Sequence, residues 1–436
     1  MDVSGPIDLG KSRLLESEGK SRAILIGVYF SSKEKESCNE HLQELNALSD
    51  TFGLEVIDKI AVPLKKIESS TFIGSGKVIE LAELIEENNI DIVVFDLEIS
   101  PHQQRNLEKA FKKSVIDRTE LILGVFAIHA RSKEARLQVK LAQFKYELPR
   151  LKRLWTHLSR QRTGGSRGGY LKGAGETQIE IDRQSLKKKI SDLQNEIEEL
   201  IKHRDVLRKK RERSNIPTFA IVGYTNSGKS TLLNALTDAK VLVEDKLFAT
   251  LDTTTKSFIL PNGQQILLID TVGFIRKLPH TLIASFRSTL EEALRADFLI
   301  HLIDASSPNA KNQAIASYEV LKELKALDRT IITCLNKTDK VEDRSILSFF
   351  KIEYPNTVEI SALKKEGLDD LVSMMIQEIS NMRQIVKLKI PQSYYKVVSE
   401  LIKEGRVISL VYEENNILLE IEIPKSLKSK IALFEI

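Results

Sequence analysis

Residues 223–230 read Gly223-Tyr224-Thr225-Asn226-Ser227-Gly228-Lys229-Ser230 and fit the phosphate-binding loop pattern G-x-x-x-x-G-K-[ST]. The loop lies between Phe219 to Val222, an apolar run that predicts a strand, and Thr231 to Leu236, a run that predicts a helix. In such a loop, glycines let backbone N–H groups converge on the α- and β-phosphates. The lysine charge lies at the β- and γ-phosphates, and the serine hydroxyl reaches Mg²⁺. We therefore expect a nucleotide-binding α/β domain around this stretch.

Three further motifs follow predicted strands in the order expected of a guanine-nucleotide site. Asp270-Thr271-Val272-Gly273 supplies an acid that can hold Mg²⁺ through water and a backbone N–H that can meet the γ-phosphate. Asn336-Lys337-Thr338-Asp339 supplies a carboxylate that can accept from the N1–H and N2–H₂ groups of guanine, a pair of donors that adenine lacks. Ser361-Ala362-Leu363 completes the base pocket through backbone contacts. The order and spacing of these motifs favour GTP over ATP.

The chain of 436 residues is long enough for several domains. Its patterns divide it into a polar tail (1–20), a small α/β domain (21–130), a basic helical hairpin (131–213), the nucleotide domain (214–380) and a small α+β domain (381–436). The fold class expected is therefore multidomain α/β. In the nucleotide domain a doubly wound sheet is expected, with strands near Thr218–Val222, Gln265–Ile269, Phe298–Ile303, Thr330–Leu335 and Val358–Ile360.

The N-terminal domain alternates between strand and helix patterns, which predicts a mostly parallel sheet. The expected strands are Ala23–Phe30, Glu55–Val62, Ile90–Asp96 and the segment from Val115 onward, and the expected helices are Glu36–Phe52, Gly76–Glu87 and Gln103–Lys113. The C-terminal domain reads as a strand, a helix from Tyr394 to Lys403 and two more strands.

Between these domains the apolar residues are spaced alternately four and three apart, which is a heptad pattern. One series is Leu137, Leu141, Phe144, Leu148, Leu151, Trp155 and Leu158, and the other, which has one Arg in its seam, is Leu186, Ile190, Leu193, Ile197, Leu200, Arg204 and Leu207. Pro149 should kink the first helix. The glycine-rich segment between the series, Thr163 to Gly175, cannot stay helical, so an antiparallel hairpin is expected.

The hairpin is also where the positive charge gathers. The whole chain has a net charge of +4, whereas residues 131–213 hold 23 Lys and Arg against 11 Asp and Glu. Such a block indicates contact with nucleic acid or an anionic surface. At the tip, phosphate contact and base stacking are both available from Arg160, Arg162, Arg167, Lys172, Tyr170 and the nearby Trp155. The alternative is that the glycines only join two helices.

Composition excludes several classes of protein. No apolar run approaches the ~18 residues of a membrane span, and the acidic N-terminal stretch is the wrong pattern for a secretory signal. Only two cysteines occur, Cys38 and Cys334, and they predict buried thiols rather than a disulfide framework or a zinc site. A cytoplasmic, monomeric protein is expected.

The chain resembles the HflX GTPases from about residue 20 to its end. The resemblance rests on Phe72-Ile73-Gly74-Ser75-Gly76-Lys77, Asp117 to Leu123 (DRTELIL), Leu148-Pro149-Arg150-Leu151 and Gly175-Glu176-Thr177-Gln178, in addition to the nucleotide motifs. It implies an N-terminal α/β domain and a helical hairpin before the GTPase domain, and binding to the large ribosomal subunit and its RNA. Some bacterial members of this family split stalled ribosomes, so the resemblance also implies this activity. The chain has Thr253 where the family usually has proline.

The resemblance also assigns switch I to Phe248-Ala249-Thr250-Leu251-Asp252. Thr250 would then join Ser230 as a Mg²⁺ ligand and, with Lys229, form the catalytic pair, although Thr254 is an alternative one turn away. Phe274 stands where many GTPases place a water-orienting Gln, so unaided hydrolysis should be slow. Either the ribosome orders the switches, or Asn226 holds K⁺ beside the phosphates.

The function expected is a GTP-hydrolysing switch that binds GTP and GDP and associates with the large ribosomal subunit. Two other functions stay open at this stage. One is an ATP- or GTP-driven RNA remodelling enzyme, which the basic hairpin beside a phosphate-binding loop suggests. The other is a nucleotide-gated adaptor with peripheral association at the inner membrane, because a basic face also suits anionic lipid.

Overall fold

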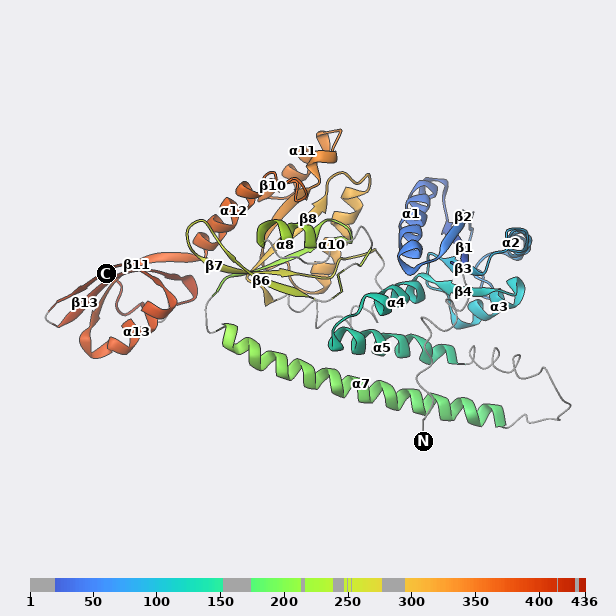
Figure 1. Cartoon of the computed structure of the whole chain (residues 1–436), viewed down its shortest axis with the longest axis horizontal. Helices are drawn as coiled ribbons and strands as arrows, with labels where there is room; N and C mark the ends of the chain where they lie inside the picture. Colours follow the sequence, from blue (N-terminus) through green and yellow to red (C-terminus); the bar gives the residue numbers. More distant parts are fainter. Residues whose placement is uncertain are drawn as a thin grey trace. The chain divides into compact units, whose positions relative to one another are not determined.

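The structure is a computed structural model in which the described residues form two compact units. The first unit comprises residues 20–151, 174–201, 247–248, 250–251 and 275–276. The second comprises residues 202–212, 216–237, 253–274, 295–413, 415–427 and 431–436. Among these residues no helix combines the length and apolar character needed to cross a membrane. Figure 1 labels most of the elements of both units.

The N-terminal domain is a four-stranded parallel sheet in the order β2-β1-β3-β4. Its strands and helices alternate as β1 (Arg22–Tyr29), α1 (Lys35–Phe52), β2 (Glu55–Pro63), α2 (Ser75–Glu87), β3 (Ile92–Phe95), α3 (Pro101–Phe111), β4 (Ser114–Asp117) and α4 (Arg118–His129). The central strands β1 and β3 are short runs of Val, Ile and Leu and are buried, as helices on both faces of a parallel sheet require. The alternation predicted from the sequence is confirmed.

The segment from Val115 onward is an exception, because the strand expected there stops at Asp117. The Asp117 side chain accepts from the backbone N–H of Glu120 at 2.9 Å and caps helix α4, which begins at Arg118. The expectation of a continuing strand was wrong, since a fully buried apolar run does not distinguish helix from strand by its periodicity.

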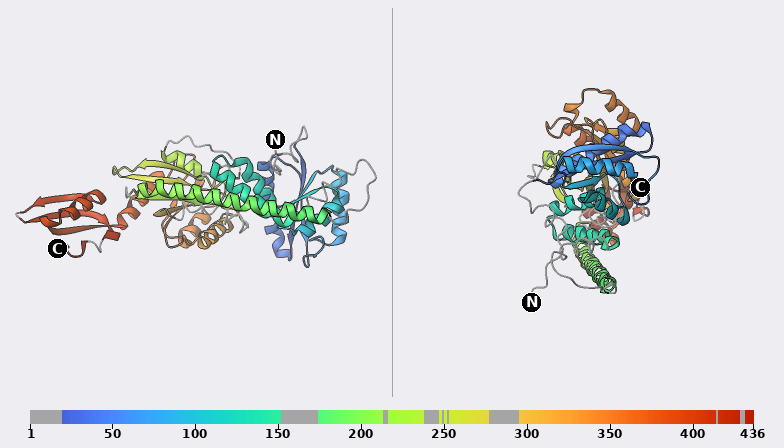
Figure 2. Two further views of the ribbon diagram at one scale, coloured as in Figure 1. Left: turned by 90° about the horizontal axis from the view of Figure 1, so that it is seen from below. Right: turned by 90° about the vertical axis from the view of Figure 1, so that its right-hand side faces the viewer.

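The hairpin pairs α5 (Lys133–Glu147) with the long helix α7 (Ala174–Glu212), the green rod in Figure 2. The predicted seam is present, since Phe144, Leu151 and Leu186 form a buried cluster against which Leu148, Ile190 and Leu193 pack. The Nζ atom of Lys133, at the start of α5, lies 2.8 Å from a carboxylate oxygen of Glu196, whereas Leu151, just beyond the end of α5, packs in the cluster with Leu186, earlier in α7, so the helices run antiparallel. A 3₁₀ turn at Leu148–Arg150 ends α5 around Pro149. The predicted tip, including Trp155, Arg160, Arg162, Arg167, Tyr170 and Lys172, lies outside the described residues.

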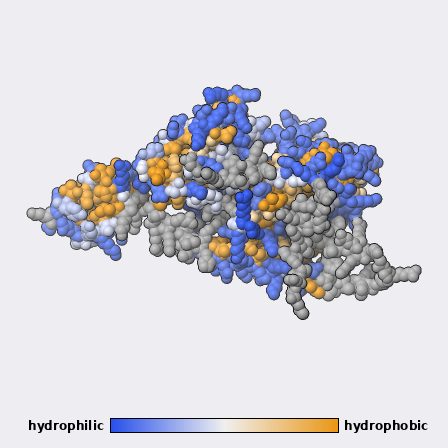
Figure 3. Space-filling model, in the orientation of Figure 1, coloured by the Kyte–Doolittle hydropathy of each residue, from blue (hydrophilic) through white to orange (hydrophobic). Residues whose placement is uncertain are grey.

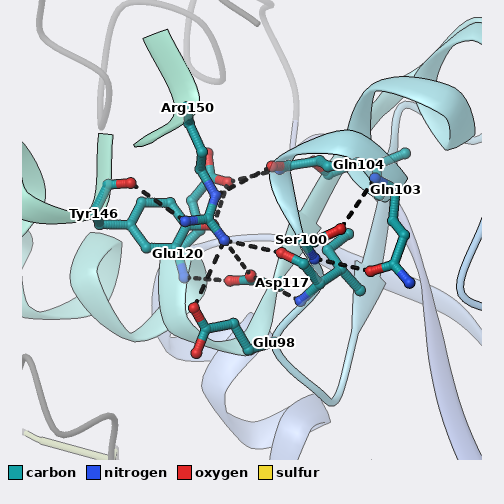
Figure 4. A network of polar contacts seen from close by, with 10 residues as sticks. Glu98, Ser100, Gln103, Gln104, Asp117, Glu120, Tyr146 and Arg150 are labelled. Carbon is teal, nitrogen blue, oxygen red and sulfur yellow. Dashed lines mark hydrogen bonds and ion pairs between the residues drawn. The ribbon is translucent and has the colours of Figure 1, made fainter. Parts of the chain in front are cut away.

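The first arm of the hairpin is joined to the N-terminal domain by a buried polar network around Arg150 (Figure 4). The Arg150 guanidinium donates to the Ile99 carbonyl at 2.9 Å and pairs with Asp117 at 3.3 Å. It also lies over the Tyr146 ring, 3.6 Å from the centroid. Burial raises the pKa of Asp117 to about 6 even though Arg150 opposes the shift. The network therefore links residues of two separate sequence motifs, DRTELIL and LPRL.

The nucleotide domain is built on a six-stranded sheet in the order β10-β9-β8-β5-β7-β6. All neighbours are parallel except the edge strand β6, which is antiparallel to β7 and was not predicted. The strands are β5 (Thr218–Gly223), β6 (Thr254–Ile259), β7 (Gln265–Asp270), β8 (Phe298–Asp304), β9 (Thr330–Asn336) and β10 (Thr357–Glu359). The helices described in this domain are α8 (Lys229–Thr237), α10 (Ala310–Glu323), α11 (Ser345–Glu353) and α12 (Leu368–Asn381). The doubly wound sheet is confirmed.

In the described residues of the C-terminal domain, a three-stranded antiparallel sheet in the order β11-β13-β12 is accompanied by helix α13. Its elements are β11 (Arg383–Pro391), α13 (Tyr395–Glu404), β12 (Arg406–Tyr412) and β13 (Asn416–Pro424). Strand β12 lies at the edge of the sheet, and Val407, Ile408, Val411 and Tyr412 on it are exposed. Hydrophobic residues are visible at the surface of this domain in Figure 3.

Candidate nucleotide site

The predicted phosphate-binding loop begins where β5 ends and leads into α8 at Lys229. Gly223 has a φ of 152°, and a Cβ added there would lie 2.3 Å from the Leu302 carbonyl oxygen on the neighbouring strand β8. Only glycine fits this position, because the chain turns away from the sheet directly against β8. The turn brings Lys229 and Ser230 to the first residues of a helix, where backbone N–H groups are unpaired and favour anions.

The Lys229 ammonium points back into the loop. Its Nζ donates to the carbonyl oxygens of Tyr224 at 2.7 Å and Gly223 at 3.3 Å. Burial lowers the pKa of Lys229 to about 8, with Asp270 opposing the shift and Lys337 adding to it. A buried cation of this kind is stabilised by a phosphate placed beside it.

Asp270 and Ser230 meet at the end of β7, where the Ser230 hydroxyl donates to Oδ2 of Asp270 at 2.6 Å. The carboxylate is fully buried, and its Oδ1 has no hydrogen-bond partner among the described residues. Burial raises the pKa of Asp270 against the opposing effects of Ser230 and Lys229. A hydroxyl and a carboxylate oxygen in one place form an oxygen donor set, which suits Mg²⁺.

Backbone hydrogen bonds connect the segment after Asp270 to the phosphate-binding loop. Phe274 donates its N–H to the Gly223 carbonyl at 2.9 Å and accepts at its own carbonyl from the Thr225 N–H at 2.7 Å. A Cβ added to Gly273 would lie 2.8 Å from the Thr225 Cα and 2.9 Å from the Lys229 Nζ. Gly273 therefore lies next to Lys229, and a side chain at position 273 would clash with the lysine ammonium.

Asn336 of the base-selecting tetrad braces two loops. Its Nδ2 donates to the Ser227 carbonyl at 2.8 Å, and its Oδ1 accepts from the Ala362 N–H at 3.0 Å. Asn336 is buried, so its amide connects the phosphate-binding loop to the segment Ser361-Ala362-Leu363. Three of the predicted motifs are therefore brought together by one side chain.

Substitution of Gly228 by alanine should break this brace. Gly228 has a φ of 98°, and an added Cβ would lie 2.4 Å from the Nδ2 of Asn336. We expect Gly228→Ala to weaken GDP binding by at least roughly tenfold, because the backbone is strained and the amide is displaced. Isothermal calorimetry with GDP measures the loss. Gly263→Ala is the matched control, since Gly263 also has a positive φ, of 79°, but lies in the β6–β7 turn with open space around it. Equal losses in both variants would contradict the role of the brace.

Asp339 is half-buried and is oriented by the serine of the next motif. The Ser361 hydroxyl donates to Oδ1 of Asp339 at 2.7 Å, and this bond is the main reason that the Asp339 pKa is lowered. The carboxylate is therefore ionised at neutral pH and can act as an acceptor. Lys337, with a left-handed φ of 60°, pairs with Asp304 at 2.7 Å. Thr338 donates its hydroxyl to the Ile360 carbonyl at 3.0 Å, and Leu363 is exposed.

The protein families and relatives whose sequences match this chain are GTP-binding GTPases, in agreement with the nucleotide site described above. Residues 39–127, 129–211 and 218–337 match the families described as "GTP-binding GTPase N-terminal", "GTP-binding GTPase Middle Region" and "50S ribosome-binding GTPase". GTPase HflX of Chlamydia pneumoniae is 46% identical over 420 residues, which cover 96% of this chain and 89% of the relative. The chain belongs to the HflX family of GTPases.

Other HflX relatives match over similar lengths. GTPase HflX of Caldanaerobacter subterraneus subsp. tengcongensis is 41% identical, with 95% of this chain and 94% of the relative covered. That of Escherichia coli (strain K12) is 38% identical, with 90% and 88% covered. As a member of this family the chain is a GTP-binding enzyme that hydrolyses GTP to GDP and phosphate.

Of the switch I residues predicted from the HflX resemblance, Phe248, Thr250 and Leu251 are described and belong to the first unit, whereas the phosphate-binding loop belongs to the second. Ala249 and Asp252 are outside the described residues, Thr250 is half-buried and Leu251 is buried. The alternative threonine, Thr254, begins strand β6. The assignment of Thr250 stays a prediction.

Phe248 has a contact that sequence reasoning missed. Its ring is 2% exposed and packs edge-on against Phe126 of α4, with centroids 4.5 Å apart. Its φ of 58° is unusual for a bulky residue and costs on the order of 1–3 kcal/mol, which the packing must offset. Nothing in the sequence around Phe248 indicates that it would pack against Phe126.

Proposed function

We propose that this HflX-family GTPase is a nucleotide-dependent switch that associates with the large ribosomal subunit. The observation that carries the proposal is the match of its nucleotide domain, residues 218–337, to the family described as "50S ribosome-binding GTPase". The basic hairpin supports it, because residues 131–213 carry a large excess of Lys and Arg over Asp and Glu. Action on stalled ribosomes, including separation of the subunits, is the finer form of this proposal.

In this proposal the residues of the candidate site act on GTP in the roles that their positions favour. The phosphate-binding loop and the N-terminus of α8 hold the α- and β-phosphates, and Lys229 neutralises charge that develops on the β- and γ-phosphates. Gly273 offers its N–H to the γ-phosphate. Asp339 selects guanine, and Asn336 keeps the base-binding loops in place.

The metal is proposed to be Mg²⁺, because bound Mg²⁺ stabilises phosphoryl transfer through its positive charge and takes oxygen ligands. Ser230 supplies one ligand directly, Asp270 holds the ion through water, and Thr250 is proposed as the second protein ligand. Asn226, exposed and with a φ of 60°, is the residue proposed to hold K⁺.

Sedimentation tests the switch. Purified large subunits are centrifuged through sucrose with the protein and either GDP or a non-hydrolysable GTP analogue. We expect the protein to move with the large subunit in the presence of the analogue and to remain at the top of the gradient with GDP. Equal binding in both nucleotides would contradict a nucleotide-dependent switch. Absence of binding in both would contradict the ribosomal partner.

The place of RNA contact is tested at the tip of the hairpin. Replacing Arg160, Arg162, Arg167 and Lys172 by glutamine should lower the affinity for large subunits and flatten its salt dependence, because each phosphate contact releases a counterion. GTP affinity should not change. Co-sedimentation across a salt series measures both quantities.

A matched control replaces four exposed lysines outside the hairpin, Lys59, Lys65, Lys66 and Lys109, by glutamine. If the tip variant keeps the affinity and salt slope of the unchanged protein, the tip is a linker. If the affinity for large subunits and its salt dependence fall in the control variant instead, the N-terminal domain makes the contact.

A further inference from the structure

Helices α4 and α5 of the first unit form an antiparallel pair whose two ends are held in different ways. At one end, residues 130–132 connect α4 to α5 within the chain. At the other end, Asp117 caps the start of α4, and its carboxylate lies 3.3 Å from the guanidinium of Arg150, which follows the end of α5 (Figure 4). Arg150 therefore closes the end of the pair that lies opposite the chain connection.

The Arg150 guanidinium contacts several parts of the N-terminal domain at once. It donates to the Ile99 carbonyl after β3, to Oε1 of Gln104 on α3 at 3.4 Å, and to Asp117 at the end of β4. A further N–H donates to the Tyr146 carbonyl on α5 itself at 3.3 Å. The Arg150 side chain is 6% exposed, and Asp117 and Gln104 are fully buried. Loss of the guanidinium would therefore leave charged and polar groups buried without their donor.

The acceptors around the guanidinium are themselves fixed within the N-terminal domain. Asp117 accepts from the backbone N–H of Ile99 at 3.3 Å as well as from that of Glu120. Gln104 donates to the Val115 carbonyl at 2.7 Å. These acceptors are tied to the main chain of a loop, a strand and a helix, so together they define one position for the end of α5.

The end of α5 is the part of the hairpin from which the chain continues toward the tip. Leu151, directly after Arg150, packs in the apolar cluster with Leu186 of α7, so both arms of the hairpin meet beside the guanidinium. Arg160, the first of the tip residues proposed to contact RNA, follows ten residues later in the sequence. Several side chains meet the phosphates of a folded RNA together at least cost when the surface that carries them is already held in one orientation.

We propose that Arg150 is a positioning residue for binding to the large ribosomal subunit, because it locks the hairpin against the N-terminal domain so that the two present one rigid surface to ribosomal RNA. The requirement is for an arginine, since a planar guanidinium donates to several acceptors in a fixed fork and stacks on the Tyr146 ring, whereas a lysine ammonium is a single point charge. The inference rests on the proposed function, in which the hairpin contacts the large subunit.

The central test is Arg150→Gln, measured by co-sedimentation with large subunits and a non-hydrolysable GTP analogue. We expect the affinity for large subunits to fall by at least about tenfold, because binding must then also order the hairpin. GDP affinity should not change, since position 150 lies outside every nucleotide motif. Arg150→Lys should restore only part of the affinity. An unchanged affinity in Arg150→Gln would overturn the inference.

The rigidity of the hairpin is measured directly by the distance between two spin labels. One label is attached at Glu87→Cys on α2 and the other at Gln194→Cys on α7, both exposed positions of the first unit. The native Cys38 and Cys334 are buried, which directs the labels to the introduced cysteines. We expect a narrow distance distribution in the otherwise unchanged protein and a broad one in Arg150→Gln. Equally narrow distributions in both would contradict the lock.

Leu81→Ala is the matched control for loss of folding stability. Leu81, on α2, is fully buried in the apolar core around the N-terminal sheet. Its truncation should lower the melting temperature, as Arg150→Gln does, but keep the affinity for large subunits and the narrow distance distribution. A similar fall of affinity in both variants would show that destabilisation of the domain, rather than positioning, weakens binding.

A double-mutant cycle with Asp117→Asn tests whether Arg150 acts through its buried partner. Asparagine keeps an oxygen that can cap α4 but removes the charge that pairs with the guanidinium. If the two residues act together, the double variant should lose no more affinity than the more severe single variant. Multiplied losses would mean that Arg150 acts independently of Asp117, contrary to the inference.

The same binding assay separates failure of this inference from failure of the proposed function. The unchanged protein and the fourfold variant of the hairpin tip are measured alongside Arg150→Gln. If the unchanged protein does not bind large subunits, the proposed function itself is wrong. If the tip variant loses affinity while Arg150→Gln keeps it, the hairpin contact stands and only the role of Arg150 is refuted.

Discussion

Lys229→Ala should reduce GTP hydrolysis by at least roughly a hundredfold, the effect typical of removing one preorganised group that stabilises transition-state charge. Lys229 is buried in the phosphate-binding loop and is the cation proposed to meet the β- and γ-phosphates. Phosphate release under single-turnover conditions measures the loss. Lys256→Ala is the control, because Lys256 is an exposed lysine on β6. A Lys229→Ala variant that hydrolyses GTP at the original rate would show that the site has been misplaced.

The same lysine predicts a pH dependence of GTP binding. Its pKa is lowered to about 8 by burial, and bound phosphates raise it by favouring the charged form. Binding therefore takes up a proton above about pH 8, so affinity should be constant below that pH and fall as pH rises above it. The dependence should vanish in Lys229→Ala, and its persistence there would assign the titration to another group.

Asp339→Ala should remove the preference for guanine over adenine. Two buried donors of the base would lose their acceptor, at a cost of about 1–3 kcal/mol, or roughly ten- to a hundredfold in GTP affinity. Affinity for ATP should change little. Competition between GTP and ATP for a fluorescent nucleotide measures both affinities.

Asp343→Ala is the control for this substitution, since Asp343 is an exposed carboxylate near Asp339 in sequence that accepts from the Ser345 hydroxyl and N–H. It should preserve the guanine preference. Equal affinities of the unchanged protein for GTP and ATP would refute the proposed role of Asp339.

The nucleotide domain was well predicted from sequence because its motifs are local. A loop such as residues 223–230 needs particular residues at fixed spacing, and the strands beside it are continuous apolar runs. Strand β6 was not predicted, because it is a half-exposed edge strand that begins with Thr254 and Thr255 and is stabilised by pairing with β7. The error at Asp117 had a different cause, since a capping side chain decided there between helix and strand.

The contacts between distant residues could not have been predicted. Phe248 was assigned to switch I and Arg276 was given no role from the sequence, and their partners Phe126 and Asp96 lie more than a hundred residues away in sequence. Neither an arginine nor a phenylalanine indicates by its type which residue it will contact. The motif containing Asp117 and the motif containing Arg150 were both noticed, but only the structure shows that they pair.

The exposed edge strand β12 has a practical consequence for work with the purified protein. Among the described strands only β13 pairs with it, and its seven residues, RVISLVY, carry exposed apolar side chains and a single charge. Edges of this kind promote strand-to-strand aggregation between molecules in concentrated solution. Crystallisation and storage conditions should therefore limit aggregation through this strand. The substitution Val411→Lys would place a charge on the strand and should improve solubility, and position 411 lies outside every nucleotide motif.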